Sequence, residues 1–284
     1  MGSAAPKSLL AKLSSVGAEP RRGLSQNFLI DDNILDKIVQ TAQVRKRDLV
    51  LEIGPGTGAL TAKLLAAGAS VLAIEADRQL ASLVREFELQ GAPLQLICGD
   101  VLQVNLSFVI EEARSRFVPQ RLLVVANLPY HLTGPILGRL LEASSLFSAF
   151  YLLVQKEVAE RLSATPPSRH SSPLGVLLHL YGKPRLAFSV APSCFWPAPK
   201  IFSALLALEL HPPRLGAVEL ELFRQFLHQA FAQRRKRLWK VLKQYHQEEL
   251  LASSWKALAL SANVRIEELS LEQLLELSTF FVEK

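Results

Sequence analysis

The sequence predicts an α/β fold, in which a doubly wound and mostly parallel sheet is followed by a small C-terminal all-helical domain. Short apolar runs alternate with helical patterns from Asp48 onward, and a glycine-rich loop joins the first run to the first helix. Beyond His211-Pro212-Pro213, only helical patterns remain. Nearly continuous runs of Val, Leu and Ile are typical of parallel strands that are buried on both faces. A chain of 284 residues, 49% of them hydrophobic, is long enough for one large and one small domain.

The expected strands follow the apolar runs before the prolines. They cover residues 48–54, 70–77, 94–100, 121–130, 149–155, 177–190 and 201–210. A helical pattern at residues 58–68 separates the first two strands. The helices expected beyond the prolines cover residues 218–245, 248–260 and 271–284. We therefore expect a flexible N-terminal extension at residues 1–23, an α/β domain at residues 24–210 and a small helical domain at residues 214–284.

The composition limits the partners and the compartment. With 32 Lys and Arg against 26 Asp and Glu, the net charge of +6 favours a polyanionic partner, either nucleic acid or a membrane surface. The chain has no run of eighteen apolar residues, so we expect no membrane span. Its two cysteines are far apart and its six histidines are scattered, so we expect no disulfide and no metal site. These features predict a protein of the cytoplasm, which is a reducing compartment.

The first 22 residues leave a second compartment open. They contain no acidic residue before Glu19. Such a segment is either a frayed basic N-terminus, which is commoner, or an organellar transit peptide.

The stretch "EIGPGTGALT" at residues 52–61 predicts a nucleoside cofactor. Gly54, Gly56 and Gly58 lie between a strand and a helix, where backbone amides and a helix N-terminus attract an anionic group. Glu75 ends the next expected strand and can accept hydrogen bonds from ribose hydroxyls. Asp100 ends the third expected strand and can hold an adenine amino group. The tight glycine spacing and this further acid favour S-adenosylmethionine, and hence a Rossmann-like methyltransferase sheet, over a nicotinamide cofactor or a glycine-rich turn without a ligand.

The stretch "VVANLPYHL" at residues 124–132 predicts a site for a planar amine. The exocyclic amine of adenine is a poor nucleophile, because its lone pair is delocalised into the ring. The side-chain oxygen of Asn127 and the carbonyl of Leu128 can accept its two hydrogens and aim it at a methyl donor. Pro129 stiffens the turn, and Tyr130 offers a ring on which a base can stack. The alternative is an ordinary turn after a strand with a buried tyrosine.

With these motifs, the chain resembles the small-subunit type of ribosomal RNA adenine dimethyltransferases from about Leu24 to its C-terminal helices. The stretches "LSQNFLIDDNIL", "EIGPGTGALT", "IEAD", "GD", "NLPY", "LLVQKEVAERL", "APSCFWPAPKIFSALL" and "FAQRRK" carry the resemblance. It implies that Asn27 and Leu29 contact the cofactor, and that Phe195 lies against the target base opposite Tyr130. It also implies transfer of four methyl groups to two neighbouring adenosines near the 3′ end of small-subunit rRNA. We expect a monomer that acts on a pre-assembled small ribosomal subunit.

The departures from the family pattern are few. Ser25 replaces a usual glycine, and His131 stands where asparagine is common. Large-subunit rRNA methylases typically carry isoleucine in place of Leu128, so "NLPY" favours the small-subunit enzyme. The intact Asn127, Pro129 and Tyr130 argue against the non-enzymatic alternative, a nucleic-acid-binding or ribosome-assembly factor on the same scaffold.

A basic run near the C-terminus is the candidate RNA surface. Arg234, Arg235, Lys236 and Arg237 are consecutive, so within the helix expected at residues 218–245 they point around its axis. They either contact rRNA phosphates or form a solvated, salt-bridged helix. With the first alternative, residues 24–210 are expected to be the catalytic domain and residues 214–284 a helical RNA-binding domain.

Overall fold

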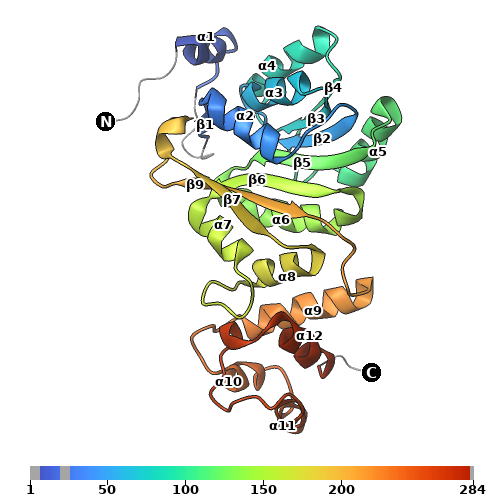
Figure 1. Ribbon diagram of the computed structural model, residues 1–284, viewed down its shortest axis with the longest axis vertical. Helices are drawn as coiled ribbons and strands as arrows, with labels where there is room; N and C mark the ends of the chain where they lie inside the picture. The colour runs from blue at the N-terminus through green and yellow to red at the C-terminus, as the bar shows by residue number, and fades with distance from the viewer. Residues whose placement is uncertain (1–6, 20–25, 282–284) are drawn as a thin grey trace. The chain divides into compact units, whose positions relative to one another are not determined.

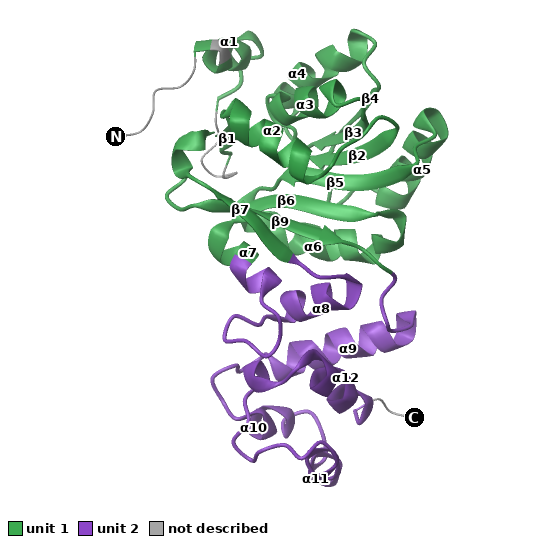
Figure 2. Ribbon diagram, viewed as in Figure 1, with its two compact units in different colours: residues 1–159, 185–211 green, residues 160–184, 212–284 purple. Residues whose placement is uncertain are grey.

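The computed structural model describes residues 7–19 and 26–281. The chain divides into two compact units (Figure 2), of which unit 1 comprises residues 1–159 and 185–211 and unit 2 comprises residues 160–184 and 212–284. Residues 160–184, which we had expected within the catalytic domain at 24–210, thus group with the C-terminal helices. The functional roles assigned to the two domains stay predictions.

Unit 1 is built on a seven-stranded sheet, which confirms the α/β prediction (Figure 1). Its strand order is β4-β3-β2-β5-β6-β9-β7; the first five are parallel, whereas β9 runs antiparallel to both β6 and β7. The strands are β2 (Asp48–Ile53), β3 (Ser70–Glu75), β4 (Leu94–Cys98), β5 (Arg121–Asn127), β6 (Ala149–Gln155), β7 (Arg185–Val190) and β9 (Ser203–Glu209). The strand order reverses beside β2, and ligands of open α/β sheets bind at such a point, outside the carboxyl ends of the strands.

Helices cover the sheet because side chains on both of its faces are apolar. The helices that begin in unit 1 are α1 (Lys7–Ser15), α2 (Asp32–Thr41), α3 (Ala59–Ala66), α4 (Arg78–Leu89), α5 (Leu106–Phe117), α6 (Thr133–Glu142) and α7 (Lys156–Ser163). Val50 packs in one core cluster with Leu64 of α3 and Val84 of α4. Its neighbours Leu49 and Leu51 point to the opposite face and are also fully buried. Burial on both faces explains why the strands are nearly continuous apolar runs.

Two short strands bring distant segments of unit 1 together. The strand β1 (Phe28–Leu29) pairs antiparallel with β8 (Phe195–Trp196). The backbone N–H of Ile30 also donates to the carbonyl of Cys194 at 2.8 Å. The segment at residues 26–30 is therefore held by a stretch that lies far away in the sequence.

The strand expected at residues 177–190 is wrong in its first half. Residues Pro173–Tyr181 form helix α8, and β7 begins only at Arg185. The Ser172 side chain accepts a hydrogen bond from the N–H of Gly175, and Pro173 occupies the first turn, as is common at helix starts. A short, continuous apolar run does not distinguish a buried helix from a buried strand, so the capping residues were the informative signal.

The single helix expected at residues 218–245 is also wrong. Unit 2 contains α9 (Ala217–Ala230), α10 (Leu238–Leu242), α11 (Glu248–Ala257) and α12 (Leu271–Thr279), and turns lie between α9 and α10. The buried stripe of α9 consists of Phe223, Phe226, Leu227 and Ala230. Continuing the helix would bring Arg234 and Arg237 onto this stripe, four and seven residues beyond Ala230. Ending the helix keeps those two charges out of the core.

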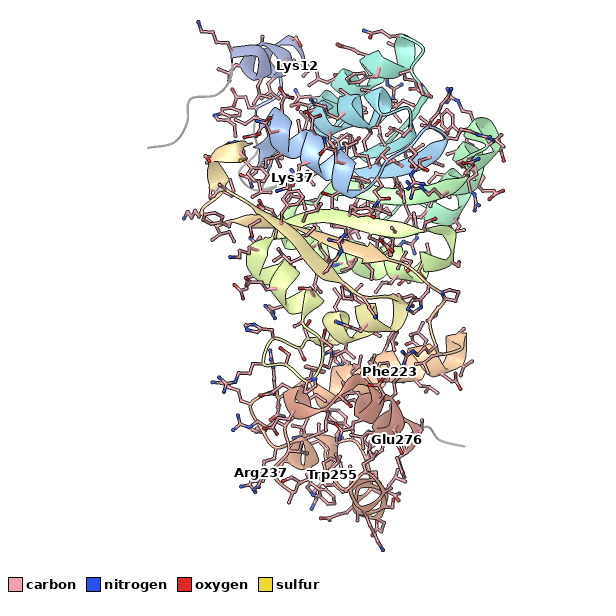
Figure 3. The ribbon with its side chains drawn as sticks, in the orientation of Figure 1. Lys12, Lys37, Phe223, Arg237, Trp255 and Glu276 are labelled. Carbon is pink, nitrogen blue, oxygen red and sulfur yellow. The ribbon has the colours of Figure 1, made fainter. Side chains whose placement is uncertain are left out.

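The apolar side chains of α10 then form a separate contact within unit 2. Leu238, Val241 and Leu242 are buried, and the Leu238 N–H donates to the carbonyl of Val264 at 2.8 Å. The rings of Trp239 and Trp255 meet edge to face at 5.1 Å. Figure 3 labels Trp255, together with Phe223 of α9.

Part of the N-terminal extension that was expected to be flexible is helical. Helix α1 buries Leu9 and Leu13 against Phe28 and Leu80 of unit 1. Its apolar residues recur at helical spacing, which is typical of a helix that packs on a core and not of a frayed terminus. None of the described helices is long and apolar enough to cross a membrane.

Candidate functional site

A pocket in unit 1 lies at the carboxyl ends of the central strands and has a volume of about 240 Å³. Three segments form its walls: residues 26–29, the glycine loop after β2, and the turn after β5. The proposed site residues that line it are Asn27, Leu29, Gly54, Gly56, Glu75, Asp100, Asn127, Leu128, Pro129 and Tyr130. The fold thus gathers every proposed cofactor residue, and four of the five proposed catalytic residues, around one cavity.

The glycine loop requires glycine for two separate reasons. Gly54, Gly56 and Gly58 have φ values of 67°, 58° and 76°, which L-residues with side chains rarely adopt. A Cβ atom on Gly56 would lie 3.2 Å from the ring of Phe28, and one on Gly58 would lie 2.7 Å from the ring of Phe87. Any side chain here would strain the backbone and push away a neighbouring ring.

The carboxylate of Glu75 is tied to this loop. One of its oxygens accepts a hydrogen bond from the Gly56 N–H at 3.0 Å, and the other accepts from the Asp77 N–H at 2.9 Å. Burial raises the pKa of Glu75, and these two backbone bonds oppose the rise. A carboxylate offers about four acceptor positions, so Glu75 can hold the loop and still accept hydrogen bonds from ribose hydroxyls.

Sequence analysis did not assign a role to Glu52, a second acid in the pocket wall. Its side chain is 1% exposed and accepts a hydrogen bond from the Thr61 hydroxyl at 2.7 Å. Burial, with a smaller contribution from the charge of Glu75, raises the pKa of Glu52 to about 8, although the Thr61 bond opposes the shift. The sequence does contain a signal for Glu52, because an acidic residue there interrupts a mostly apolar strand.

Glu52 should make the stability of the folded protein depend on pH. The folded protein keeps this proton up to about pH 8, whereas the unfolded chain releases it near 4.5. Stability from this group is therefore complete below pH 4.5 and is lost as pH rises toward 8. We expect Glu52→Gln, which keeps an acceptor for Thr61, to be more stable than the parent at pH 8 by a few kcal/mol, on the order of 1.4 kcal/mol per pKa unit. Urea unfolding at pH 5 and pH 8 measures the difference, and equal pH dependence of the two proteins would contradict the assignment.

The turn after β5 presents the amide and the ring at the pocket. The Asn127 side-chain nitrogen donates to the carbonyl of Asn27 at 3.1 Å, which fixes the side-chain oxygen as the acceptor end of the amide. The Leu128 N–H donates to the carbonyl of Leu153 at 3.1 Å and anchors the turn to β6. Asn127, Pro129 and Tyr130 are half-buried, so a ligand can reach them.

Ser203 is a neighbour of this turn that sequence analysis missed. It is fully buried at the start of β9, and its hydroxyl lies 2.6 Å from that of Tyr130. The two residues are 73 positions apart in the chain. The contact holds the Tyr130 ring by its far end, and burial raises the pKa of Tyr130, which keeps the phenol neutral.

The position of Phe195 differs from the one that the resemblance implies. It is fully buried, packs in the same core cluster as Leu29, and does not line the pocket. In this structure its ring is not available to face a base opposite Tyr130. Stacking on a base would require the β1–β8 pairing to open, so the role that the resemblance gives Phe195 stays a prediction.

The basic run lies in unit 2, in the turns between α9 and α10 rather than on a helix. Arg234 is engaged locally: it donates to the carbonyl of Arg169, and its Nε lies 3.9 Å from a carboxylate oxygen of Glu267. Arg235, Lys236 and Arg237 are exposed; Figure 3 labels Arg237 at the periphery of this unit.

These three cations border an open depression in unit 2, which we call the basic surface. It is lined by Arg235, Lys236, Arg237, Lys240, Lys243, Gln244 and Arg265. The side chain of Lys243 also pairs with Glu248 at 2.9 Å. A concave surface lined by charges of one sign focuses the electrostatic potential and attracts anions.

Comparisons with known proteins identify the family. The family model described as ribosomal RNA adenine dimethylase matches residues 17–283. The chain belongs to the ribosomal RNA adenine dimethylase family. It is 40% identical over 273 residues to the ribosomal RNA small subunit methyltransferase A of Protochlamydia amoebophila, covering 96% of this chain and 95% of the relative. It is 38% identical over 284 residues to the enzyme of the same name from Chlamydia caviae, covering 98% and 97%.

Solved structures agree with this assignment. A dimethyladenosine transferase from Plasmodium falciparum superposes with a TM-score of 0.69 at 26% identity, covering 88% of this chain and 95% of that one. The 23S rRNA methyltransferase ErmE, at 24% identity, covers 90% and 100% with a TM-score of 0.67 and shows the shared fold.

This member of the adenine dimethylase family is an S-adenosylmethionine-dependent methyltransferase, so the nicotinamide alternative is rejected. Its pocket fits that cofactor, because acidic side chains lie at the ends of two neighbouring strands and the space beside Gly54, where a Cβ atom would meet nothing within 4 Å, is open to a ligand. Among the residues that the structure describes, no three His, Cys, Asp or Glu side chains gather into a possible metal site.

Proposed function

We propose that this protein dimethylates two adjacent adenosines near the 3′ end of small-subunit rRNA within a pre-assembled small ribosomal subunit. The observation that carries the proposal is the Asn127–Tyr130 turn, which lines the same cavity as the glycine loop, Glu75 and Asp100. The small-subunit methyltransferases that match nearly the whole chain support this substrate. The function implies a role in small-subunit biogenesis, and we propose that the protein acts as a monomer in the cytoplasm.

The cofactor is held by groups at three strand ends. Glu75 would accept hydrogen bonds from the ribose hydroxyls and Asp100 would accept from the adenine amine, while the positive potential at the N-terminus of α3, after the glycine loop, would favour the carboxylate. Asn27 and Leu29, in the wall formed by residues 26–29, would cover the bound cofactor. When bound, S-adenosylmethionine supplies an electrophilic methyl group.

The turn after β5 prepares the target amine. The Asn127 oxygen and the Leu128 carbonyl accept its hydrogens, which localises the nitrogen lone pair and orients it. Tyr130 stacks on the flipped base, and Ser203 holds that ring in place. The acceptors are preorganised, because the Asn127 amide is bonded to Asn27 and the turn is anchored on β6.

Methyl transfer from labelled S-adenosylmethionine tests the function. The substrates are under-methylated small subunits, large subunits and free small-subunit rRNA. We expect labelled dimethyladenosine in the small subunits and little in the other two. Labelling of large subunits alone would favour a large-subunit methylase, and binding to small subunits without labelling would favour an assembly factor.

We propose that the basic surface of unit 2 contacts rRNA phosphates. Exposed cations from the turn, from α10 and from Arg265 meet there, and phosphate and shape contacts dominate the recognition of folded RNA. Arg234, which sequence analysis grouped with them, supports the fold of this segment through Arg169 and Glu267.

Arg235→Glu/Lys236→Glu should weaken small-subunit binding and flatten its salt dependence by roughly one unit of slope for each phosphate that is no longer neutralised. Cofactor affinity should stay the same, because the cofactor pocket lies in unit 1. The matched control is Lys183→Glu/Lys256→Glu, which makes the same charge change at exposed positions of unit 2 that do not line the basic surface. Titrations at several salt concentrations measure both quantities. Equal slopes for the two variants would mean that the RNA surface lies elsewhere.

A further inference from the structure

Helix α1 contacts two residues of the cofactor pocket from outside. Its buried Leu9 and Leu13 share a core cluster with Ala18, Phe28, Leu80 and Leu83. Phe28 and Leu80 also line the pocket, whereas none of the α1 side chains that the structure describes does. These two side chains therefore have α1 on one side and the ligand cavity on the other.

Phe28 links α1 to the glycine loop. Its ring packs so closely on Gly56 that a Cβ atom there would lie 3.2 Å from two ring carbons. Gly56 in turn donates its N–H to Glu75 at 3.0 Å. A displacement of the Phe28 ring would thus reach both the loop and the acid that we assign to the ribose.

A second contact connects the turn after α1 to the helix after β3. The Gln79 side-chain nitrogen donates to the carbonyl of Gly17 at 2.9 Å. Gln79 and Leu80 lie in the first turn of α4, where the Asp77 carboxylate accepts hydrogen bonds from both of their N–H groups. This turn of α4 begins at Arg78, three residues after Glu75. The segment of α1 therefore contacts the pocket wall that carries the proposed ribose-binding acid.

We propose that α1 is a positioning element of the cofactor site, whose docking holds Phe28 on the glycine loop and Leu80 in the pocket wall. Binding of S-adenosylmethionine then depends on a helix that does not touch it. The proposal rests on the proposed function only in that this pocket is the one that holds the cofactor. It assigns a role to a segment in which the sequence predicted only flexibility or targeting.

Thermodynamic reciprocity gives a test in the unaltered protein. If docked α1 favours the cofactor, saturation with the cofactor must favour docked α1 by the same factor. We expect S-adenosylmethionine to slow amide hydrogen exchange in residues 7–18 about five- to tenfold, although the side chains described in this segment do not line the pocket. The amides of α12 in unit 2 serve as the reference. Unchanged exchange in residues 7–18 at saturation overturns the proposal.

A pair of variants provides the second test. Leu9→Ala/Leu13→Ala removes the buried face of α1, whereas Leu10→Ala truncates a leucine of the same helix that is 43% exposed. By calorimetry, the double variant should bind S-adenosylmethionine about five- to tenfold more weakly, because fewer molecules have the site formed. The Leu10 control should stay within about twofold, since an exposed side chain adds little to docking.

The outcomes separate this proposal from the proposed function. Equal cofactor affinity of the double variant and the unaltered protein overturns the role of α1, whatever the substrate is. Failure of the unaltered protein to methylate small subunits overturns the proposed function and leaves the calorimetric comparison valid. If the double variant does not fold, Gln79→Ala, which removes the bond to Gly17, should both reduce exchange protection in residues 7–18 and weaken S-adenosylmethionine binding. Reduced protection with unchanged affinity overturns the role of α1.

Discussion

Replacing Asn127 with alanine should lower the rate of methyl transfer at least about 100-fold, comparable to the loss of one oxyanion-hole donor. The amide oxygen acts mainly in the transition state, where the amine nitrogen gives its lone pair to the methyl carbon. Turnover should therefore fall more than the apparent affinity for the small subunit. Single-turnover methylation of under-methylated small subunits measures the chemical step directly.

The same substitution removes the bond from the Asn127 amide to the carbonyl of Asn27. Cofactor affinity must therefore be measured separately, since a loosened opening segment would weaken binding without any effect on chemistry. His131→Ala is the matched control, because His131 lines the same pocket from the same turn and has no proposed role in the transfer. A rate near that of the unaltered protein at saturating cofactor would reject the catalytic role of Asn127.

Loss of Glu75 should weaken S-adenosylmethionine binding about ten- to a hundredfold, because a hydrogen bond to a charged group is worth roughly 1.5–3 kcal/mol. Glu75→Ala removes the acceptor proposed for the ribose hydroxyls. It also leaves the N–H groups of Gly56 and Asp77 without their partner. Isothermal calorimetry gives the affinity, and binding to small subunits should change little because the basic surface lies in unit 2.

Glu75→Gln separates the contribution of the negative charge from that of the hydrogen bonds by which Glu75 supports the glycine loop. It keeps one oxygen for the backbone N–H groups but removes the charge, so its effect should be smaller than that of Glu75→Ala. An affinity for S-adenosylmethionine that both variants retain in full would exclude Glu75 from cofactor binding. If both variants lose affinity equally, the charge rather than loop support is the main contribution.

Local patterns in the sequence were sufficient to predict the sheet and the ends of its central strands. Apolar runs bounded by Gly54, Glu75 and Asn127 mark strands whose carboxyl ends must meet at one edge, because parallel strands joined by helices leave no other arrangement. Glycines with positive φ and an Asn-Leu-Pro-Tyr turn were recognisable for the same reason: each depends on neighbours within a few residues. The sequence therefore predicted one edge of the sheet as the place for a nucleoside cofactor and a planar amine.

Local patterns were misleading where burial or charge outweighed them. The run at residues 173–181 is apolar enough for a strand, but the Ser172 cap and Pro173 start a helix. The run at residues 218–245 has a helical period throughout, but Arg234 and Arg237 would fall on its buried stripe, so the chain turns instead.

Contacts between distant residues were decided by the tertiary structure alone. Asn127 bonds to a carbonyl 100 residues away, and Tyr130 meets Ser203 across 73 residues. The docking of α1 on Phe28 and the burial of Phe195 in the core cluster that contains Leu29 also depend on contacts between distant residues. Such contacts leave no periodicity in the sequence, because each depends on which surfaces the packed sheet brings together. The sequence by itself determined the fold and the chemical groups of the site, and only packing decided which of those groups are held, which are buried and which remain open to a ligand.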